Sequence, residues 1–354
     1  MHRARTASRR TVIIVSAALA GCIIAAFVAV AAGSGFFGAA PSGEPDDGNA
    51  SRMPPSACGS SCALVIEPED GVAPVIAFIR GAARSLDLVD YELEDPSIVT
   101  ALADSFRRGV AVRVLLNHRT YNDAAYYSLE AAGVPVRWAP ARFTFTHEKS
   151  MVADGTKGFI MTFNLVPHYY ATGRDFGILD DDPADTAAME AVFGADWNDA
   201  PLDPAPVGDD LVWSPGSRRA LLALIASARG SLEVYNEEMA DDMVTAALAA
   251  AARKGVRVDI VMTYSPDWHG AFAALAAAGA HIRTFRASAS GLYIHAKMIV
   301  ADGAQAFVGS ENFSATSLEE NRELGVMLRD PAVLAALRTV FARDQAAAEP
   351  FRAG

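Results

Sequence analysis

The feature that most constrains the fold of this chain is an internal repeat. Residues 84–136 recur at residues 230–282, with similar residues at matching positions and a constant displacement of 146, so that Gly109 corresponds to Gly255. After a two-residue insertion the displacement becomes 148 and stays there through the rest of the match. Two unrelated segments would not keep register for so long. The chain therefore carries two copies of one half.

Each half alternates predicted strands with predicted amphipathic helices, the pattern of an α/β protein whose parallel or mixed sheet is covered by helices. We expect two pseudo-symmetric lobes at residues 61–199 and 209–354, joined by a Pro-rich linker at 200–208. The predicted helices lie near residues 72–83, 96–108, 122–132, 217–229, 241–253 and 268–279. The predicted strands lie near residues 85–91, 110–116, 134–138, 231–236, 256–262 and 281–285.

The first 60 residues differ in composition from the rest of the chain. Residues 1–10 carry four arginines and no acid, and residues 11–32 form an uncharged apolar run of 22 residues. As a helix this run would measure about 33 Å, enough to cross a bilayer core. We interpret the two segments as a cytoplasmic basic arm and a single transmembrane signal anchor, followed by a flexible stalk at 33–60 that places the lobes on the extracytoplasmic side. The alternatives are a cleaved signal peptide, which would make the protein secreted, and a lipoprotein signal ending at Cys22.

Charge and cysteine content limit the partners of the exported part. Without the four arginines of the arm, 26 basic residues stand against 42 acidic ones, a formal charge of −16. A sequence-neutral nucleic-acid binder normally needs a basic surface, so nucleic acid is the less favoured partner, unless a local basic cleft lies within the acidic total. Cys58 and Cys62 are expected to pair in an oxidising compartment.

The first half contains a motif of catalytic side chains, His147-Glu-Lys149 followed by Asp154. On a strand, residues two apart share one face, so His147 and Lys149 point the same way, whereas Asp154 points the other way and is expected to have a supporting role. The return segment places Thr162 and Asn164 two apart in the same manner. We expect the Thr162 hydroxyl to contact substrate and the Asn164 amide to act in catalysis.

The second half presents the same motif at the same spacing. His295, Lys297 and Asp302 are followed by Ser310 and Asn312, with Ser310 expected to contact substrate. The two halves together supply two imidazoles, two ammonium groups and two carboxamides. These groups suit transfer at a phosphodiester, because the ammonium and amide groups can stabilise charge on the non-bridging oxygens while one imidazole attacks and the other acts as an acid. Zinc is disfavoured, because a catalytic zinc site needs about three protein ligands and the motif offers lysine instead.

The repeated H-x-K-x4-D motif with its downstream asparagine resembles the phospholipase D superfamily over roughly residues 63–345. The resemblance implies a two-lobed α/β fold with a shared site at the lobe interface, and neither metal nor cofactor. It implies that His147 is the nucleophile and His295 the general acid. It also implies an acid crossed between the lobes for each imidazole, Asp175 for His295 and Glu323 for His147.

One departure from symmetry is visible in the motif. Met161-Thr162 stands where the second half has Gly309-Ser310, which keeps the hydroxyl but adds bulk. The first half-site is therefore expected to be the tighter one.

The leading functional hypothesis is a phospholipase D that hydrolyses phospholipids, or passes the phosphatidyl group to an alcohol, outside the cytoplasmic membrane. The alternatives are an endonuclease of the same superfamily, a cardiolipin synthase-like transferase, and a non-catalytic scaffold that binds phosphate-bearing ligands. The synthase alternative is weakened, because such relatives typically have more than one amino-terminal membrane helix. No obligate protein partner is indicated, and the true diester, the preferred acceptor and the oligomeric state are not specified by these residues.

Overall fold

The protein is described by a computed structural model that covers residues 57–58, 62–204 and 210–353. The predicted basic arm, membrane anchor, nearly all of the stalk and part of the linker lie outside the described residues. Within the described ranges, no helix combines the length and the apolar character needed to cross a membrane. The backbone pairs Cys58 with Cys62 in a short hairpin, while their side chains lie outside the description.

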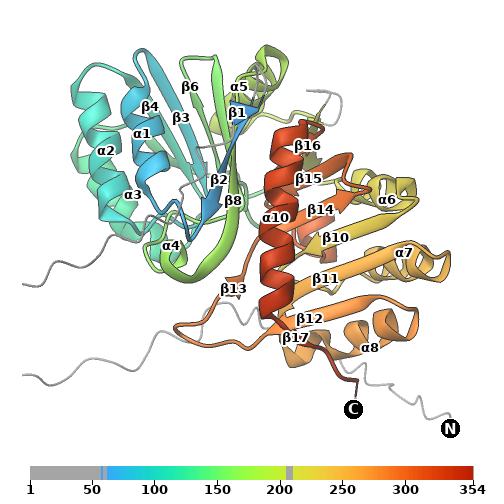
Figure 1. Cartoon of the computed structure of the whole chain (residues 1–354). Coiled ribbons are helices and arrows are strands. Elements are labelled where there is room, and N and C mark those ends of the chain that lie inside the picture. Colours follow the sequence, from blue (N-terminus) through green and yellow to red (C-terminus); the bar gives the residue numbers. More distant parts are fainter. Residues whose placement is uncertain (1–56, 59–61, 205–209, 354) are drawn as a thin grey trace, which may run out of the picture. The chain divides into compact units, whose positions relative to one another are not determined.

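The first lobe is a mixed sheet with helices (Figure 1). Its strand order is β1-β2-β8-β7-β6-β3-β4-β5, parallel among β3, β4 and β5 and antiparallel elsewhere along this path. The strands are β1 (Ala57–Cys58), β2 (Cys62–Glu67), β3 (Ser85–Asp90), β4 (Ala111–Leu116), β5 (Val136–Trp138), β6 (Ser150–Ala153), β7 (Lys157–Met161) and β8 (Gly173–Asp180). The helices are α1 (Ala73–Gly81), α2 (Pro96–Arg107), α3 (Asp123–Ala131), α4 (Tyr169–Thr172) and α5 (Pro183–Trp197), with a 3-10 turn η1 (Thr120–Asn122).

The second lobe repeats this arrangement. Its order is β17-β12-β11-β10-β14-β15-β16-β9, which matches the first lobe strand for strand apart from the terminal strands β1 and β17. The strands are β9 (Leu211–Ser214), β10 (Ser231–Tyr235), β11 (Arg257–Thr263), β12 (His281–Phe285), β14 (Lys297–Ala301), β15 (Gln305–Gly309), β16 (Glu323–Leu328) and β17 (Glu349–Pro350). A short further strand of this half, β13 (Tyr293–Ile294), pairs in parallel with β8 of the first sheet. The helices are α6 (Arg218–Ser227), α7 (Asp242–Arg253), α8 (His269–Ala277), α9 (Ala315–Glu319) and α10 (Pro331–Ala347), with η2 (Pro266–Trp268). The predicted α/β class, the mixed sheets and the two related lobes are confirmed.

The duplicated sequence also repeats the local signals that begin the helices. Asp95 caps α2 by accepting from the backbone N–H of Ser97, and Asp241 caps α7 by accepting from Val244. An Asp-Pro pair begins both α5 and α10, because the aspartate side chain accepts from the first free N–H groups and proline needs no acceptor at the first helical position.

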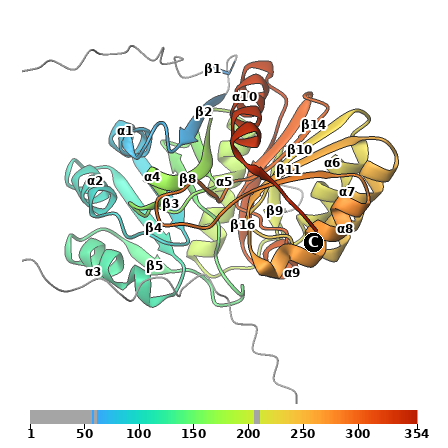
Figure 2. The same cartoon turned by 60° about the horizontal axis from the view of Figure 1, so that its bottom comes forward.

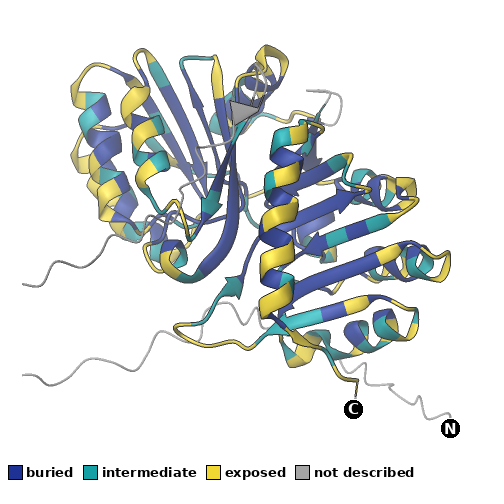
Figure 3. Ribbon diagram, viewed as in Figure 1, coloured by how far each residue is buried: buried dark blue, intermediate teal, exposed yellow. Residues whose placement is uncertain are grey.

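Two helical layers cover the outer faces of the sheets. Figures 1 and 2 show α1–α3 beside the first sheet and α6–α8 beside the second, each on the side away from the other lobe. Each layer has its own apolar core. Exposed residues gather on the outward faces of the helices, while the strands are mostly buried (Figure 3).

A third apolar cluster joins the lobes. It combines Phe176 and Ile178 of β8 with Trp213 of β9, and it includes side chains of both α5 and α10. Burial of such side chains contributes about 1.5–3 kcal/mol each, so the inner faces of the two sheets form one core rather than a loose contact. This shared core packs the two sheets together where the motif residues lie.

Candidate active site

The two lobes exchange backbone hydrogen bonds at the motif histidines. The N–H groups of His147 and Glu148 donate to the carbonyl of Arg322, at 2.8 and 2.9 Å. The N–H groups of His295 and the residue after it donate to the carbonyl of Arg174, at 3.2 and 2.8 Å. The first backbone N–H groups of each motif are therefore hydrogen-bonded to the other lobe. Because His147 and Glu148 bond to the other lobe in this way, regular strand β6 begins only at Ser150.

Each imidazole pairs with a buried acid from the opposite lobe. His147 Nδ1 lies 2.7 Å from Glu323 on β16, and His295 Nδ1 lies 2.9 Å from Asp175 on β8. The crossed placement that the resemblance implied is thus present in the structure. With Nδ1–H donating to a carboxylate, the imidazole is held in one orientation and its Nε2 is directed to the site.

The buried environment of His147 changes the pKa of its imidazole. Burial lowers the pKa of His147 to about 4, against the opposing charge of Glu323 and with a further lowering from Lys149. His147 is therefore neutral at pH 7, with its Nε2 lone pair free for attack. This is the protonation state that a nucleophile requires.

The two motif lysines differ in their partners. Lys149 Nζ donates to the carbonyl of His147 at 2.6 Å and lies 4.9 Å from the ring centre of Tyr91. Lys297 Nζ instead lies 3.2 Å from the carboxylate of Glu237. Burial lowers the pKa of Lys149 to about 8.

The two motif asparagines both reach glutamates that the sequence analysis did not select. Asn164 Nδ2 donates to Glu92 at 3.3 Å, and Asn312 Nδ2 donates to Glu237 at 3.4 Å. Glu92 and Glu237 both follow the strands that pair with the motif strands, β3 and β10. That position, directly after the first strand of each repeat, was the available signal for them.

Thr162 and Ser310 contact the strands that carry the two acids paired with the imidazoles. The Thr162 hydroxyl donates to Asp175 at 2.5 Å and accepts from the N–H of Phe176 at 2.9 Å, so its one hydrogen is already used. Ser310 is fully buried and accepts from the N–H of Leu324 at 3.2 Å. Their placement favours a role in orienting the acid strands over the expected contact with substrate.

Asp154 and Asp302 lie at the turns that end the motif strands. Asp154 accepts from the N–H groups of residues 83–85, and Asp302 accepts from those of residues 229–231. Both adopt a left-handed backbone, with φ of 59° and 55°. Neither carboxylate joins the imidazoles, so both connect the motif turn to the start of a neighbouring strand, as a supporting role requires.

A protein-family model described as "Cardiolipin synthase, PLD-like domain" matches the chain twice, at residues 75–197 and 221–345. The two matches coincide with the two lobes and together cover more than half of the chain. The chain belongs to the phospholipase D superfamily.

Relatives of this phospholipase D-like chain include cardiolipin synthases. The cardiolipin synthase of Oceanobacillus iheyensis is 25% identical over 313 residues, covering 75% of this chain and 64% of that protein. The major cardiolipin synthase of Bacillus subtilis is 26% identical over 290 residues, covering 69% and 59%. The chain therefore spans less than two thirds of the length of these relatives.

Two solved structures share the fold. The phosphatidylserine synthase of Haemophilus influenzae superposes with a TM-score of 0.62 at 11% identity, covering 81% of this chain and 87% of that one. The polyphosphate kinase of Porphyromonas gingivalis gives 0.64 at 14% identity, covering 79% and 46%. At these identities the likeness concerns the fold alone.

Beside the phospholipase D-like site, two buried arginines join the lobes, and neither was singled out from the sequence. Arg174 lies 2.6 Å from Asp344 of α10, and Arg322 lies 2.8 Å from Asp196 of α5. Each arginine directly precedes one of the crossed acids in the chain. The constant displacement of 148 relates both arginines and both aspartates and was the signal that could have found them.

Replacing Asp196 with Ala is expected to lower the free energy of unfolding by about 3–5 kcal/mol, because Arg322 would remain buried without its carboxylate. Glu349→Gln is the matched control, since it breaks a pair with Arg286 in which both side chains are mostly exposed. That change should cost less than about 1 kcal/mol. Urea denaturation followed by circular dichroism measures both, and equal losses would contradict the prediction.

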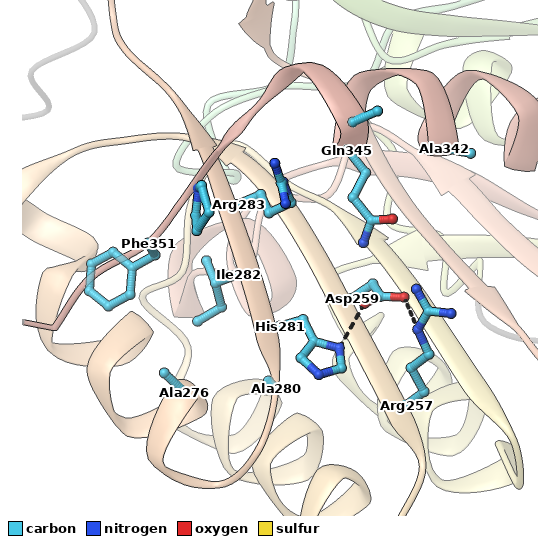
Figure 4. A pocket seen from close by; sticks show the side chains of 12 residues that line it. Arg257, Asp259, Ala276, Ala280, His281, Ile282, Arg283, Ala342, Gln345 and Phe351 are labelled. Atoms are coloured by element: carbon cyan, nitrogen blue, oxygen red, sulfur yellow. Dashed lines mark hydrogen bonds and ion pairs between the residues drawn. The ribbon is translucent and has the colours of Figure 1, made fainter.

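A separate hollow on the second lobe has its own lining residues, Arg257, Asp259, His281, Arg283, Gln345 and Phe351 among them (Figure 4). Asp259 there lies 2.7 Å from Arg257 and 3.0 Å from His281. The acid is already paired with basic groups, and the hollow includes none of the paired motif residues.

Proposed function

We propose that this protein is a metal-independent phosphatidyltransferase that acts on phospholipids through a covalent phosphohistidine on His147. The crossed pairing of His147 with Glu323 and of His295 with Asp175 carries the proposal, because it supplies two oriented imidazoles to one interface. Membership of the superfamily and the cardiolipin synthase relatives support it.

The reaction proceeds in two steps. In the first, His147 Nε2 attacks phosphorus, the bond from phosphorus to the leaving oxygen breaks, and His295 donates a proton to that oxygen. In the second, His295 takes the proton of an incoming alcohol, whose oxygen attacks phosphorus and releases His147. The motif lysines and asparagines stabilise charge on the non-bridging oxygens, and loss of one such donor typically costs about 2.7–4 kcal/mol of barrier.

The similarity to cardiolipin synthases favours an alcohol, rather than water, as the acceptor of the phosphatidyl group. From the sequence, hydrolysis comes first and the synthase reading later, whereas the matched relatives are cardiolipin synthases. We therefore place transfer of a phosphatidyl group to the hydroxyl of a second phospholipid ahead of hydrolysis. A location at the membrane fits this substrate.

A direct test uses phosphatidylglycerol vesicles in the presence of a chelator, with lipid products identified by mass spectrometry. Cardiolipin together with free glycerol is the expected result. Phosphatidic acid with glycerol would show that water is the acceptor and would return the hydrolase reading to first place. Release of neither product, from this lipid or from phosphatidylcholine and phosphatidylethanolamine, would overturn the proposal.

Nucleic acid is the less favoured substrate. The exported part is strongly acidic overall, with 26 basic residues against 42 acidic ones, whereas a sequence-neutral nucleic-acid binder normally needs a basic surface. We expect supercoiled plasmid to remain intact in the same chelating buffer, and efficient nicking would favour the endonuclease instead.

Activity is expected to be bell-shaped in pH. His147 attacks only when neutral, so activity rises as the pH increases through about 4, the pKa of His147. Lys149 stabilises charge only when protonated, so activity falls as the pH increases through about 8, the pKa of Lys149. These limits belong to the coupled site rather than to single residues. A profile of kcat from pH 3 to 10 measures them. Lys149→Arg keeps the charge and should extend activity to higher pH, and an unmoved basic limb would leave that limb to another group.

A further inference from the structure

The two half-sites differ at one equivalent position beside the histidines. The repeat places Tyr91 after β3 and Glu237 after β10, at the constant displacement of 146. An aromatic residue and a carboxylate thus occupy matching places in a site that is otherwise nearly symmetric. Tyr91 contacts His147, and Glu237 contacts His295.

Glu237 contacts three donor groups of the second half-site with one oxygen. Its Oε2 lies 3.4 Å from His295 Nε2, 3.2 Å from Lys297 Nζ and 3.4 Å from Asn312 Nδ2. Its other oxygen accepts from the hydroxyl of Tyr293 at 2.8 Å. An imidazole, an ammonium and a carboxamide converging on one anionic oxygen form the arrangement expected around a phosphate oxygen.

At the equivalent position the first half-site carries an aromatic ring in place of the carboxylate. The ring of Tyr91 meets His147 edge-on, with centres 4.5 Å apart, and lies beside Lys149. Among the described residues, His147 therefore has one carboxylate within ion-pair distance, that of Glu323. His295 has two, Asp175 on Nδ1 and Glu237 on Nε2.

We propose that Glu237 is a positioning residue that occupies the phosphate position of the second half-site before substrate binds, holds His295 as an imidazolium, and withdraws when the phosphodiester enters. Two carboxylates lie beside this ring, 2.9 Å from Nδ1 and 3.4 Å from Nε2, and their negative charges favour the protonated form. The difference between Tyr91 and Glu237 then fixes His147 as nucleophile and His295 as acid in advance. The inference rests on the proposed phosphoryl transfer, since it divides the roles of that reaction.

Burial and charge agree with this reading. Burial raises the pKa of Glu237, but the charges of His295 and Lys297 outweigh it and hold that pKa well below its usual range. Glu237 therefore remains a carboxylate at neutral pH. The titratable groups that face the His295–Glu237 pair from the surrounding elements are Asp175, Lys297, Lys149, Tyr293, Tyr169, Tyr91, His147, Glu92, Glu238 and His168.

The glutamate is also the member of this group that can leave. Its side chain is 21% exposed, whereas those of His295 and Lys297 are 3% and 0% exposed. A phosphodiester monoanion that replaces the carboxylate leaves the charge of the half-site unchanged. The imidazolium would thus keep an anionic neighbour throughout the exchange.

The test compares Glu237→Gln with wild type in two measurements that do not need turnover. In histidine-labelled protein observed by NMR, the midpoint at which His295 loses its second proton should fall by about one to three pH units in the variant, since an opposite charge within contact distance is removed. Inorganic phosphate should bind the variant about tenfold more tightly or better, because the competing carboxylate is gone. A merely structural defect would weaken phosphate binding instead.

Glu238→Gln is the matched control, since it removes the same charge one residue away, and the ion pairs of His295 among the described residues are with Asp175 and Glu237 instead. It should leave both readouts close to wild type. An unchanged His295 midpoint together with unchanged or weaker phosphate binding in Glu237→Gln overturns the inference, as does an equal effect from Glu238→Gln. Wild-type turnover of phospholipid is scored separately, so failure of the proposed function is distinguished from failure of this assignment.

Discussion

Replacing His147 with Asn is expected to lower kcat by about 10⁶-fold, the scale seen when a covalent nucleophile is removed. Asparagine keeps a polar group of similar length but cannot form the bond to phosphorus. The side chain is also positioned by a 2.7 Å contact with Glu323, so a neighbouring group cannot readily take its place. Initial rates with phosphatidylglycerol vesicles measure the loss.

The matched variant for this prediction is His295→Asn. If His295 is the acid, its loss should matter less with a nitrophenyl leaving group, which departs without a proton, than with an alkyl one. The His147 variant should be equally inactive on both esters. Acid-labile phosphorylation of the peptide that contains His295, rather than of the one that contains His147, would reverse the two roles.

Glu323→Gln is expected to lower kcat by about 10²–10⁴-fold, because the amide no longer orients and balances His147. Asp175→Asn should give a loss of similar size, but through the other imidazole. Circular dichroism confirms that each variant is folded, which matters because both acids are fully buried.

The leaving group separates the two acid variants. Since Glu323 contacts the predicted nucleophile, its variant should be slow on nitrophenyl and alkyl esters alike. Since Asp175 contacts the predicted acid, its variant should recover markedly on the nitrophenyl ester. The opposite pattern would mean that each acid serves the histidine of its own lobe in solution, contrary to the crossed geometry.

Much of the fold was predictable because the sequence pattern of each strand and helix occurs twice, once in each half. The predicted strands near 85–91 and 231–236 correspond to β3 and β10, and the predicted helices near 96–108 and 241–253 correspond to α2 and α7. Helices α5 and α10 and the acid strands β8 and β16 were not predicted. Their sides face the other lobe, so their burial depends on partners that are distant in the chain, which periodicity within one segment does not reveal.

The site divides in the same way. The motif histidines, lysines and asparagines were found from spacing, because strand alternation is a local property. Pairing of Glu323 with His147 came only from the resemblance to a family. Glu237 was missed because a glutamate after a strand ordinarily indicates a solvated loop, and the pairing of β10 with β14 within the second lobe, which brings His295 to it, was not predicted.

The exchange of backbone hydrogen bonds at Arg174 and Arg322 has a consequence for how substrate enters. A hinge that swung the lobes apart would separate both imidazoles from their acids and strip both arginines of buried partners at once. Opening of that kind would carry too high an energy for a catalytic cycle. Gating must then occur on the scale of single side chains at the rim, while the duplicated body stays rigid from one turnover to the next.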